Sequence, residues 1–511
     1  MQLDRLLSHL TYESVQGSQQ REVTEICYHS ARVEQGSLFV CLKGFRTDGH
    51  EYLPEALKGG AQTIVIERGT VVRSGEEILL YTKDFCMRMS AVIRQDVTVI
   101  LVEDTRLALA ELSATFFDYP ARKLRMVGIT GTKGKTTTAY LTAAILRAAG
   151  HRVGMIGTIA ISDGVREIPS VHTTPESYEV QKYLADMVEK GCDCCVMEVS
   201  SQGFKMQRTA GVWYDIGVFL NIEPDHIGEG EHASFSEYLC CKSMLFRQCS
   251  LGIINWDDIH RDKILKGHTC QVETFSMKYP AMVTAEDPHF FMTQGKLYGE
   301  FLLCRGEEAF QLKMQLPGMF NIYNALAAVS VALQFGVAED AIKRGLLGAK
   351  VPGRCENVSP SDQYVLLIDY AHNEMSLQKL LEMLREFKPK RLVVLFGCGG
   401  NRSMLRRGRM GETAGHLADL TVITSDNPRW EEPERILDDI EDGIRGTGGS
   451  YVRIADRREA VAYVIEHALE GDIIVLAGKG HEGYQEIAGK KYPMSEYELV
   501  ADAIERMEAS E

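Results

Sequence analysis

The chain has 511 residues, with 56 Lys and Arg against 71 Asp and Glu, which gives a formal net charge of −15. At roughly 150 residues per domain, this length predicts about three domains. The shares of hydrophobic residues (45%) and charged residues (25%) are ordinary for a globular protein. The acidic balance argues against nucleic acid or an anionic membrane as the main partner, because both attract basic surfaces.

The 13 cysteines form an odd set without the paired CxxC spacing of a zinc site. Free thiols are typical of a reducing cytoplasm. The first residues lack a signal peptide, and no run of about 18 apolar residues predicts a membrane span. We therefore expect a cytoplasmic protein. Cys192, Cys194 and Cys195 are interpreted as small hydrophobic residues on a buried strand.

Residues 1–105 contain short β-like runs, at 37–42 and 63–66, with a helix-like segment between them. From about residue 125 to the end, apolar runs of strand length alternate with amphipathic stretches. This rhythm predicts parallel sheets covered by helices. The runs are 126–130, 194–199, 216–222, 364–368, 392–396, 420–424 and 473–476.

A break is expected at Val351-Pro352-Gly353, after a helix-like segment at 324–335. The predicted domains are therefore 1–105, 106–348 and 349–511. Polar clusters follow most of the apolar runs. Because open α/β sheets bind ligands beyond the carboxyl ends of their strands, each sheet should present its chemistry along one edge.

The segment 126–137, MVGITGTKGKTT, reads as a strand, a glycine-rich turn and the start of a helix near Lys135. Gly131 and Gly134 allow backbone N–H groups to point at phosphate oxygens, Lys135 can reach the outer phosphates, and the Thr136 hydroxyl can bind Mg²⁺. The pattern is a variant, because the position of its usual first glycine is Ile129. The alternative is a plain glycine-rich turn.

Two candidates for metal ligands follow later strands. Glu198 ends the run at 194–199, and His226 follows the run at 216–222. An acidic side chain beside a phosphate loop suits Mg²⁺. Taken alone, Glu198 would more often be an ion-pair partner and His226 more often structural, but the place of His226 after a strand end favours a ligand.

Lys242 lies on a helix that the capping-box sequence Ser234-Phe-Ser-Glu237 predicts. Tyr238, Leu239, Leu245 and Phe246 share its face, so burial would lower its pKa. A neutral buried amine can become nucleophilic, or it can take up CO₂ as a carbamate. The alternative is a lysine that snorkels to solvent.

Together these segments resemble the Mur ligase family, which builds the peptide of bacterial cell-wall precursors. The resemblance covers essentially the whole chain. Its motifs are GTKGKTT (131–137), HTTP (172–175), MEVSS (197–201), Asp225-His226, Lys242, NWDD (255–258), LPGMFNIYN (316–324), VPGR (351–354), DYAH (369–372), FGCGG (396–400), DNPR (426–429) and GKGHE (478–482).

The resemblance implies an α/β protein of three domains. These are a uridine-nucleotide domain, a central P-loop ATPase domain of mostly parallel sheet, and a Rossmann-like C-terminal domain for the incoming amino acid. It implies Mg²⁺ held by Thr136, Glu198, His226 and a carbamate on Lys242, with Lys135, Glu198, His226 and Lys242 as the catalytic set. ATP, as co-substrate, would contact Gly131, Thr132, Lys133, Gly134, Lys135, Thr136, Thr137, Asn221 and Asn324, and on closure Arg354, Asp369 and His372.

The resemblance also implies an acceptor, a UDP-linked muramoyl dipeptide, whose carboxylate is activated as an acyl phosphate and then attacked by an amine. Its expected contacts are Tyr28, Ser30, Phe45, Arg46, Thr47, Thr173, Thr174, Ser200 and Arg208. The DNPR segment (426–429) follows the apolar run at 420–424. In the family, Asn-Pro-Arg at this position goes with meso-diaminopimelate, and Arg429 can bind the distal carboxylate of that amino acid. Arg402, Asp426, Asn427, Pro428, Gly478 and Glu482 would complete the amino-acid pocket. We expect a monomer.

The sequence departs from the family's pattern at His29, Ala31, His172, Gln202, Gly228 and Ser403, mostly at acceptor contacts. These departures fit either a divergent cell-wall enzyme or a relative that uses L-lysine or another carboxylate acceptor. A folylpolyglutamate-type ligase should lack the uridine domain and the DNPR segment. A non-catalytic paralogue should have lost Lys135, Glu198 or Lys242, and all three are present.

Overall fold

The computed structural model describes residues 1–44, 47–74, 77–81, 86–88, 93, 96–228 and 230–509. It is an α/β protein, as the alternation of apolar runs predicts. Two compact units divide it: Met1–Lys135 with Gly150–Thr274, and Thr136–Ala149 with Phe275–Glu511. None of the helices in the described ranges is both long and apolar enough to cross a membrane.

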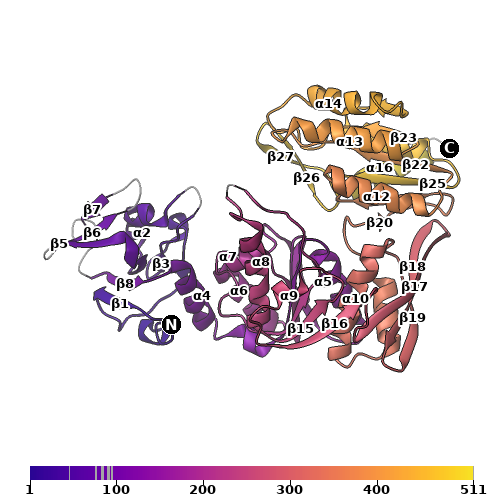
Figure 1. The fold of residues 1–511 in the computed structure, drawn as a ribbon. Coiled ribbons are helices and arrows are strands. Elements are labelled where there is room, and N and C mark those ends of the chain that lie inside the picture. The colour runs from indigo at the N-terminus through magenta and orange to yellow at the C-terminus, as the bar shows by residue number, and fades with distance from the viewer. Residues whose placement is uncertain are drawn as a thin grey trace. The chain divides into compact units, whose positions relative to one another are not determined.

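The first unit begins with a five-stranded sheet, largely parallel, with helices on both faces (Figure 1). Its apolar strand residues alternate between two cores, as expected for a sheet that is covered on both sides. The strand order is β1 (Glu13–Gln16), β8 (Thr98–Val102), β4 (Thr63–Glu67), β3 (Leu38–Val40) and β2 (Ile26–Cys27), and the helices are α1 (Leu3–Leu6), α2 (Leu53–Gly59) and α4 (Thr105–Phe116). A small antiparallel sheet joins β5 (Val71–Ser74), β6 (Glu77–Tyr81) and β7 (Cys86–Arg88).

The same unit contains a second sheet, in which β10, β13, β9, β14 and β15 are parallel neighbours. In order, its strands are β12 (Glu167–Pro169), β11 (Ala160–Ser162), β10 (Val153–Ile156), β13 (Cys194–Glu198), β9 (Arg125–Thr130), β14 (Tyr214–Phe219), β15 (Cys249–Asn255) and β16 (Gln271–Ser276). The helices of this part are α6 (Ser177–Glu189), α7 (Ser201–Lys205), α8 (Phe235–Ser243) and α9 (Arg261–Ile264), while α5 (Lys135–Ala148) belongs, after its first residue, to the second unit. Cys192, Cys194 and Cys195 are buried here, as predicted.

The second unit breaks the predicted βαβ rhythm. An antiparallel meander of β17 (Val283–Thr293), β18 (Lys296–Arg305) and β19 (Glu308–Met314) comes before α10 (Met319–Gln334) and α11 (Glu339–Gly348). Its strands alternate buried and exposed residues, as a sheet with one wet face does. Continuous apolar runs do not mark strands of this kind, so the sequence pattern does not predict β17, β18 and β19.

The C-terminal sheet has the order β20 (Glu356–Asn357), β21 (Val365–Asp369), β25 (Asp472–Ala477), β22 (Arg391–Phe396), β23 (Leu420–Ile423) and β24 (Tyr451–Arg453). Figure 1 shows α12 (Glu374–Glu386), α13 (Met404–Leu417) and α14 (Pro433–Arg445) together on one face. Helices α15 (Arg457–Glu466) and α16 (Glu496–Glu508) pack on the other face. A separate hairpin pairs β26 (Tyr484–Ile487) with β27 (Lys490–Pro493).

Candidate functional site

The polar segments of the first unit meet at one sheet edge. Strands β13, β9 and β14 are adjacent and parallel, so their carboxyl ends lie side by side. These ends lead into Ser200, the phosphate loop and Asn221 respectively. The arrangement that the sequence predicted for this sheet is therefore present.

The phosphate loop is curled tightly against the end of β14. Gly134 has φ +88°, in the left-handed region that favours glycine. A Cβ at Gly131 would lie 3.0 Å from the Cβ of Leu220, so this position needs a small residue. Lys135 Nζ donates to the carbonyls of Gly131 (2.8 Å) and Thr132 (3.2 Å). Its ammonium group therefore lies over the loop.

Asn221 holds this loop from the neighbouring strand. Its Oδ1 accepts from the Lys133 N–H at 2.9 Å, and its Nδ2 donates to the Lys133 carbonyl at 3.0 Å. The Thr132 hydroxyl lies 2.9 Å from the hydroxyl of Tyr238 on α8. These contacts fix the loop's shape before any ligand arrives. The expected adenine-side role of Asn221 stays a prediction.

Lys242 is buried, with 1% of its surface exposed. The snorkelling alternative is therefore wrong. Its Nζ donates to the Gly131 carbonyl at 2.7 Å and lies 4.7 Å from the centre of the Tyr238 ring. Burial, and then the nearby charge of Lys135, hold the pKa of Lys242 well below its usual range. A neutral amine at this point is what carbamate formation requires.

The capping box of α8 is present in a modified form. Ser234 Oγ accepts from the Glu237 N–H at 3.2 Å, as predicted. The Glu237 carboxylate, however, accepts from the N–H of Ala233, one residue before the N-cap. Both N–H groups are satisfied, and the helix begins at Phe235 as the sequence implied.

Glu198 is buried at the end of β13, and both of its carboxylate oxygens are held. Thr158 donates to them through its N–H (2.9 Å) and its hydroxyl (3.0 Å). His226 is half exposed and lies 3.1 Å from Glu231. Within the described part of the chain, no three His, Cys, Asp or Glu side chains gather as a ready-made metal site.

Four of the residues expected to contact the muramoyl dipeptide are linked, directly or through a neighbour, to the segment that contains Glu198. The Thr174 hydroxyl donates to the Glu198 carbonyl and accepts from the Ser200 N–H, both at 3.0 Å. Thr173 Oγ1 lies 3.0 Å from Thr158 Oγ1. Arg208 donates to Glu176 (2.8 Å) and to the Thr174 carbonyl (3.0 Å). Thr174 is 1% exposed, so its role in this structure is to hold the loop.

A cavity of about 740 Å³ in the first unit contains three further residues that are expected to contact the UDP-linked acceptor. Tyr28, Ser30 and Thr47 line it, together with Arg32 and Arg106. The Tyr28 hydroxyl donates to Glu179 at 2.7 Å and the Ser30 hydroxyl to Glu55 at 2.6 Å. Two of the expected contacts, Phe45 and Arg46, lie outside the described residues.

The second unit holds the remaining nucleotide candidates. Asn324 Oδ1 accepts from the Thr138 hydroxyl at 3.3 Å. The Asp369 carboxylate accepts from the N–H groups of Cys355 and Ala371, both at 2.8 Å, and burial raises its pKa. The guanidinium of Arg354 lies 4.9 Å from the centre of the Tyr370 ring. Burial also lowers the pKa of His372, so its imidazole favours the neutral form.

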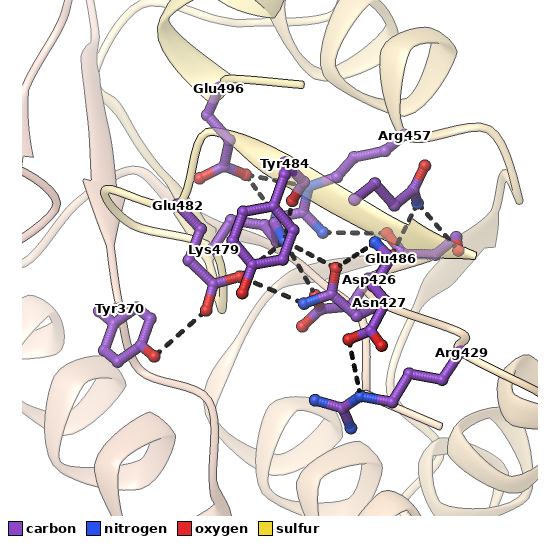
Figure 2. A network of polar contacts seen from close by, with 12 residues as sticks. Tyr370, Asp426, Asn427, Arg429, Arg457, Lys479, Glu482, Tyr484, Glu486 and Glu496 are labelled. Atoms are coloured by element: carbon purple, nitrogen blue, oxygen red, sulfur yellow. Dashed lines mark hydrogen bonds and ion pairs between the residues drawn. The ribbon is translucent and has the colours of Figure 1, made fainter. Parts of the chain in front are cut away.

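Residues predicted for the amino-acid pocket form a connected network at the carboxyl edge of the C-terminal sheet (Figure 2). Asn427 Nδ2 donates to the Glu482 carboxylate at 3.2 Å, and Tyr370 donates to its other oxygen at 3.3 Å. Arg429 has φ +54°, contacts Glu486 at 3.2 Å and donates to the Gly400 carbonyl at 2.7 Å.

The pocket's other members lie around this network. A Cβ at Gly478 would be 3.4 Å from Asp426 Oδ2. A Cβ at Gly399 would be 3.4 Å from Arg429 Nη1 and 3.9 Å from Arg402 Cγ, so both arginines flank Gly399. Arg402 is exposed, and the Pro428 carbonyl lies against Gly400.

Four residues in these contacts were absent from the predicted set. Thr158 holds Glu198, while Lys479, Glu486 and Tyr370 belong to the network of Figure 2. Tyr370 lies in the DYAH motif and Lys479 in the GKGHE motif, so the motifs themselves mark both residues as candidates. Thr158 and Glu486 lie in a strand connection and a hairpin, and nothing in their local sequence marks them.

Family models match most of the chain. They are the Mur ligase family catalytic domain at residues 22–117, the Mur ligase middle domain at 129–332 and the Mur ligase glutamate ligase domain at 353–480. A relative, the UDP-N-acetylmuramoyl-L-alanyl-D-glutamate–2,6-diaminopimelate ligase of Clostridium perfringens, is 37% identical over 99% of this chain and 100% of its own length. This chain belongs to the Mur ligase family.

Other relatives agree with this assignment. A protein of the same name from Alkaliphilus oremlandii is 38% identical and covers 98% of both chains. A solved structure of a 2,6-diaminopimelate ligase of this type has a TM-score of 0.69 at 28% identity and covers 99% of both chains. In this Mur ligase the predicted boundaries at 105 and 348 stay predictions.

Proposed function

We propose that the chain is an ATP-dependent, ADP-forming ligase that joins meso-diaminopimelate to UDP-N-acetylmuramoyl-L-alanyl-D-glutamate. The observation that carries the proposal is its likeness, along its entire length, to relatives named for this reaction. The network that joins Asn427 to Glu482, and Arg429 to Asn427 through Glu486, supports it, because a diacid amino acid offers a carboxylate to a guanidinium.

In the first step, the terminal carboxylate of the acceptor attacks the γ-phosphate of ATP and forms an acyl phosphate. Two anions must approach each other, so donors have to offset their charge. The N–H groups of the phosphate loop and Lys135, whose ammonium group lies over the loop, would supply these donors. Asn221 and Tyr238 keep the loop from rearranging as charge develops.

The donor set fits Mg²⁺. Glu198 offers a carboxylate, Thr136 a hydroxyl and a carbamylated Lys242 a second anionic oxygen group, while His226 is a further candidate. Mg²⁺ prefers oxygen ligands and commonly binds with one or two carboxylates, substrate phosphates and water, so a three-residue cluster is not needed. When bound, Mg²⁺ would neutralise negative charge on the phosphates.

In the second step, the neutral amine of the amino acid attacks the acyl carbon and phosphate leaves. Arg429 would recognise the distal carboxylate, and Glu482 the distal ammonium. L-Lysine lacks that carboxylate and could not make this contact with the guanidinium, which penalises lysine.

An ADP-release assay tests the proposal. The purified chain is given the UDP-muramoyl dipeptide and either meso-diaminopimelate, L-lysine or other amino acids, and the product is identified by mass. We expect turnover with diaminopimelate and little with lysine. Preference for lysine would contradict the role of Arg429.

A second candidate is the same chemistry on a different carboxylate acceptor. His172 and Gln202 favour it, because they replace residues that the family uses near the acceptor. No turnover with the muramoyl dipeptide, but ADP release with another carboxylate, would support this candidate. Under the main proposal, the enzyme acts as a cytoplasmic monomer in peptidoglycan synthesis, and so in cell shape and division.

A further inference from the structure

Lys479 is a fully buried lysine for which the reaction above has no role. Its surface is 0% exposed, and it lies two residues beyond the end of β25. Gly478 (φ +108°) and Gly480 (φ +53°) flank it, and these left-handed conformations curl the turn so that the lysine points inward. Figure 2 shows its ammonium group at the centre of the polar network.

Every N–H of this ammonium group has an acceptor. Nζ donates to Asn427 Oδ1 (3.0 Å), Glu482 Oε2 (2.8 Å) and the Tyr484 carbonyl (2.6 Å). An ammonium has three hydrogens, so none is left for a substrate. Lys479 can therefore act on the pocket only through the residues that it holds.

The residues held are those that face the amino acid. Asn427 Oδ1 accepts from both Lys479 and the Glu486 N–H (2.9 Å), which forces its Nδ2 toward Glu482. The Lys479 charge is also 3.5 Å from Asp426 Oδ1. Burial opposes ionisation of Glu482, but Lys479 and the hydrogen bonds hold the pKa of Glu482 below its usual range.

The backbone beside this cluster is held by contacts that do not involve Lys479. Arg457 forms a buried ion pair with Glu496 and donates to the carbonyls of Ser425 (3.2 Å) and Ala477 (3.1 Å). These carbonyls lie just beyond β23 and at the end of β25, next to Asp426 and Gly478. The backbone at these positions is held without Lys479. Loss of Lys479 should therefore displace the side chains of Asn427 and Glu482 but not the backbone that carries them.

We propose that Lys479 is a positioning residue that orients Asn427 and Glu482 for the amino-acid substrate. The inference rests on the proposed ligase function. It assigns Lys479 to the second step alone, because the side chains that Lys479 contacts, Asp426, Asn427 and Glu482, all belong to the proposed amino-acid pocket. Formation of the acyl phosphate should not depend on it.

The test compares Lys479→Met with Lys490→Met, which removes an exposed lysine from the same region. We expect Lys479→Met to raise the KM for the amino acid by about tenfold or more, since Glu482 and Asn427 lose a charged partner. The KM values for ATP and acceptor, and hydroxylamine trapping of the acyl phosphate without amino acid, should stay within about twofold of wild type. Lys490→Met should match wild type in all of these.

A second variant, Lys479→Arg, covers the case in which Lys479→Met does not fold, because it keeps a buried positive charge beside Glu482 and Asp426. Its larger, planar guanidinium cannot repeat the contacts of the ammonium group, so this variant should trap acyl phosphate yet have a raised KM for the amino acid. Equal loss of trapping and of amide formation in a folded variant would overturn the proposal, as would an unchanged KM. Wild type and variants are compared with the amino acid that gives wild type the most product. If that amino acid is not diaminopimelate, the proposed substrate is wrong, but the comparison still tests the role of Lys479.

Discussion

Burial and the neighbouring charge of Lys135 both lower the pKa of Lys242. Both favour the neutral amine, and Tyr238 and the Gly131 carbonyl leave little room for another arrangement. We predict that Lys242→Ala lowers kcat by roughly 100-fold or more, because the variant cannot form the proposed carbamate, whose oxygens would act near the reacting phosphates. The exposed Lys263→Ala is the matched control.

Carbon dioxide should matter to the same residue. Wild-type enzyme that has been depleted of CO₂ should lose activity and regain it on addition of bicarbonate, and ¹³C-bicarbonate should give a carbamate NMR signal that Lys242→Ala lacks. Full activity of Lys242→Ala would show that the lysine has no catalytic role.

Arg429 carries a prediction about selectivity. Arg429→Met should lower kcat/KM for diaminopimelate by about 100-fold, the cost of a lost bidentate charge contact, and should affect L-lysine much less. Competition between the two amino acids, read by mass, measures the ratio. Arg409→Met, which removes an exposed arginine paired with Glu374, should leave the ratio unchanged. Equal losses for both amino acids would mean that Arg429 acts only on the fold.

His481 gives the stability a dependence on pH. Burial, and then the charge of Arg354, lower the pKa of His481 to about 4. The unfolded chain therefore binds more protons than the folded one between pH 4 and the ordinary histidine range near 6.5, so stability falls as pH drops through this window. We predict that urea midpoints of His481→Gln fall less over this window than those of wild type. Parallel curves would refute the shift.

Sequence patterns located these side chains better than they described their partners. Burial of Lys242 followed from its helical face, and the place of Asn427 from the end of an apolar run. The contacts of Thr158 and Glu486 could not be predicted, because each depends on a turn or hairpin that brings distant segments together.

Helix α8 shows how one cap supports an active-site element. Ser234 Oγ accepts from the Glu237 N–H, and the helix carries both Tyr238 and Lys242. Ser234→Ala should destabilise the protein by about 1 kcal/mol, the usual cost of a lost N-cap. Ser236→Ala, at an exposed position of the same helix, should change the free energy of unfolding little. Urea unfolding compares the two, and equal effects would contradict the capping role.

The parallel strands were predictable as elements because strands buried on both faces read as apolar runs. Strands β17, β18 and β19 were not, since alternation of polar and apolar residues over a long meander resembles an amphipathic surface segment. The β26–β27 hairpin has mostly exposed or half-buried residues, so no hydrophobic pattern marked it either.

For the whole molecule, the predicted C-terminal domain has a core of its own. One side of its sheet packs residues from Cys355 to Ala477, with Leu297 as the one member from outside, and the other side is closed entirely within the domain. Residues 349–511 expressed alone should therefore show helical circular dichroism and cooperative unfolding. A disordered fragment would contradict the predicted boundary at 348.

The net charge of −15 says little about ligands, all of which are anions under the proposed function. Local cations and N–H groups at the sheet edges oppose the acidic average of the surface. Composition could therefore predict only an ordinary globular protein, whereas the class of fold needed the rhythm of apolar runs and the site needed motifs and strand ends.

The Gly131 carbonyl accepts from both Lys135 and Lys242, so the two lysine nitrogens share one oxygen. Carbamylation would turn Lys242 from a competitor of Lys135 into its counter-ion. ATP phosphates would in turn draw Lys135 away from the carbonyl and relieve the crowding. By thermodynamic linkage, CO₂ and ATP would then change each other's affinity for the protein by the same factor, without direct contact between them. Dissolved CO₂ would set how tightly this loop holds ATP.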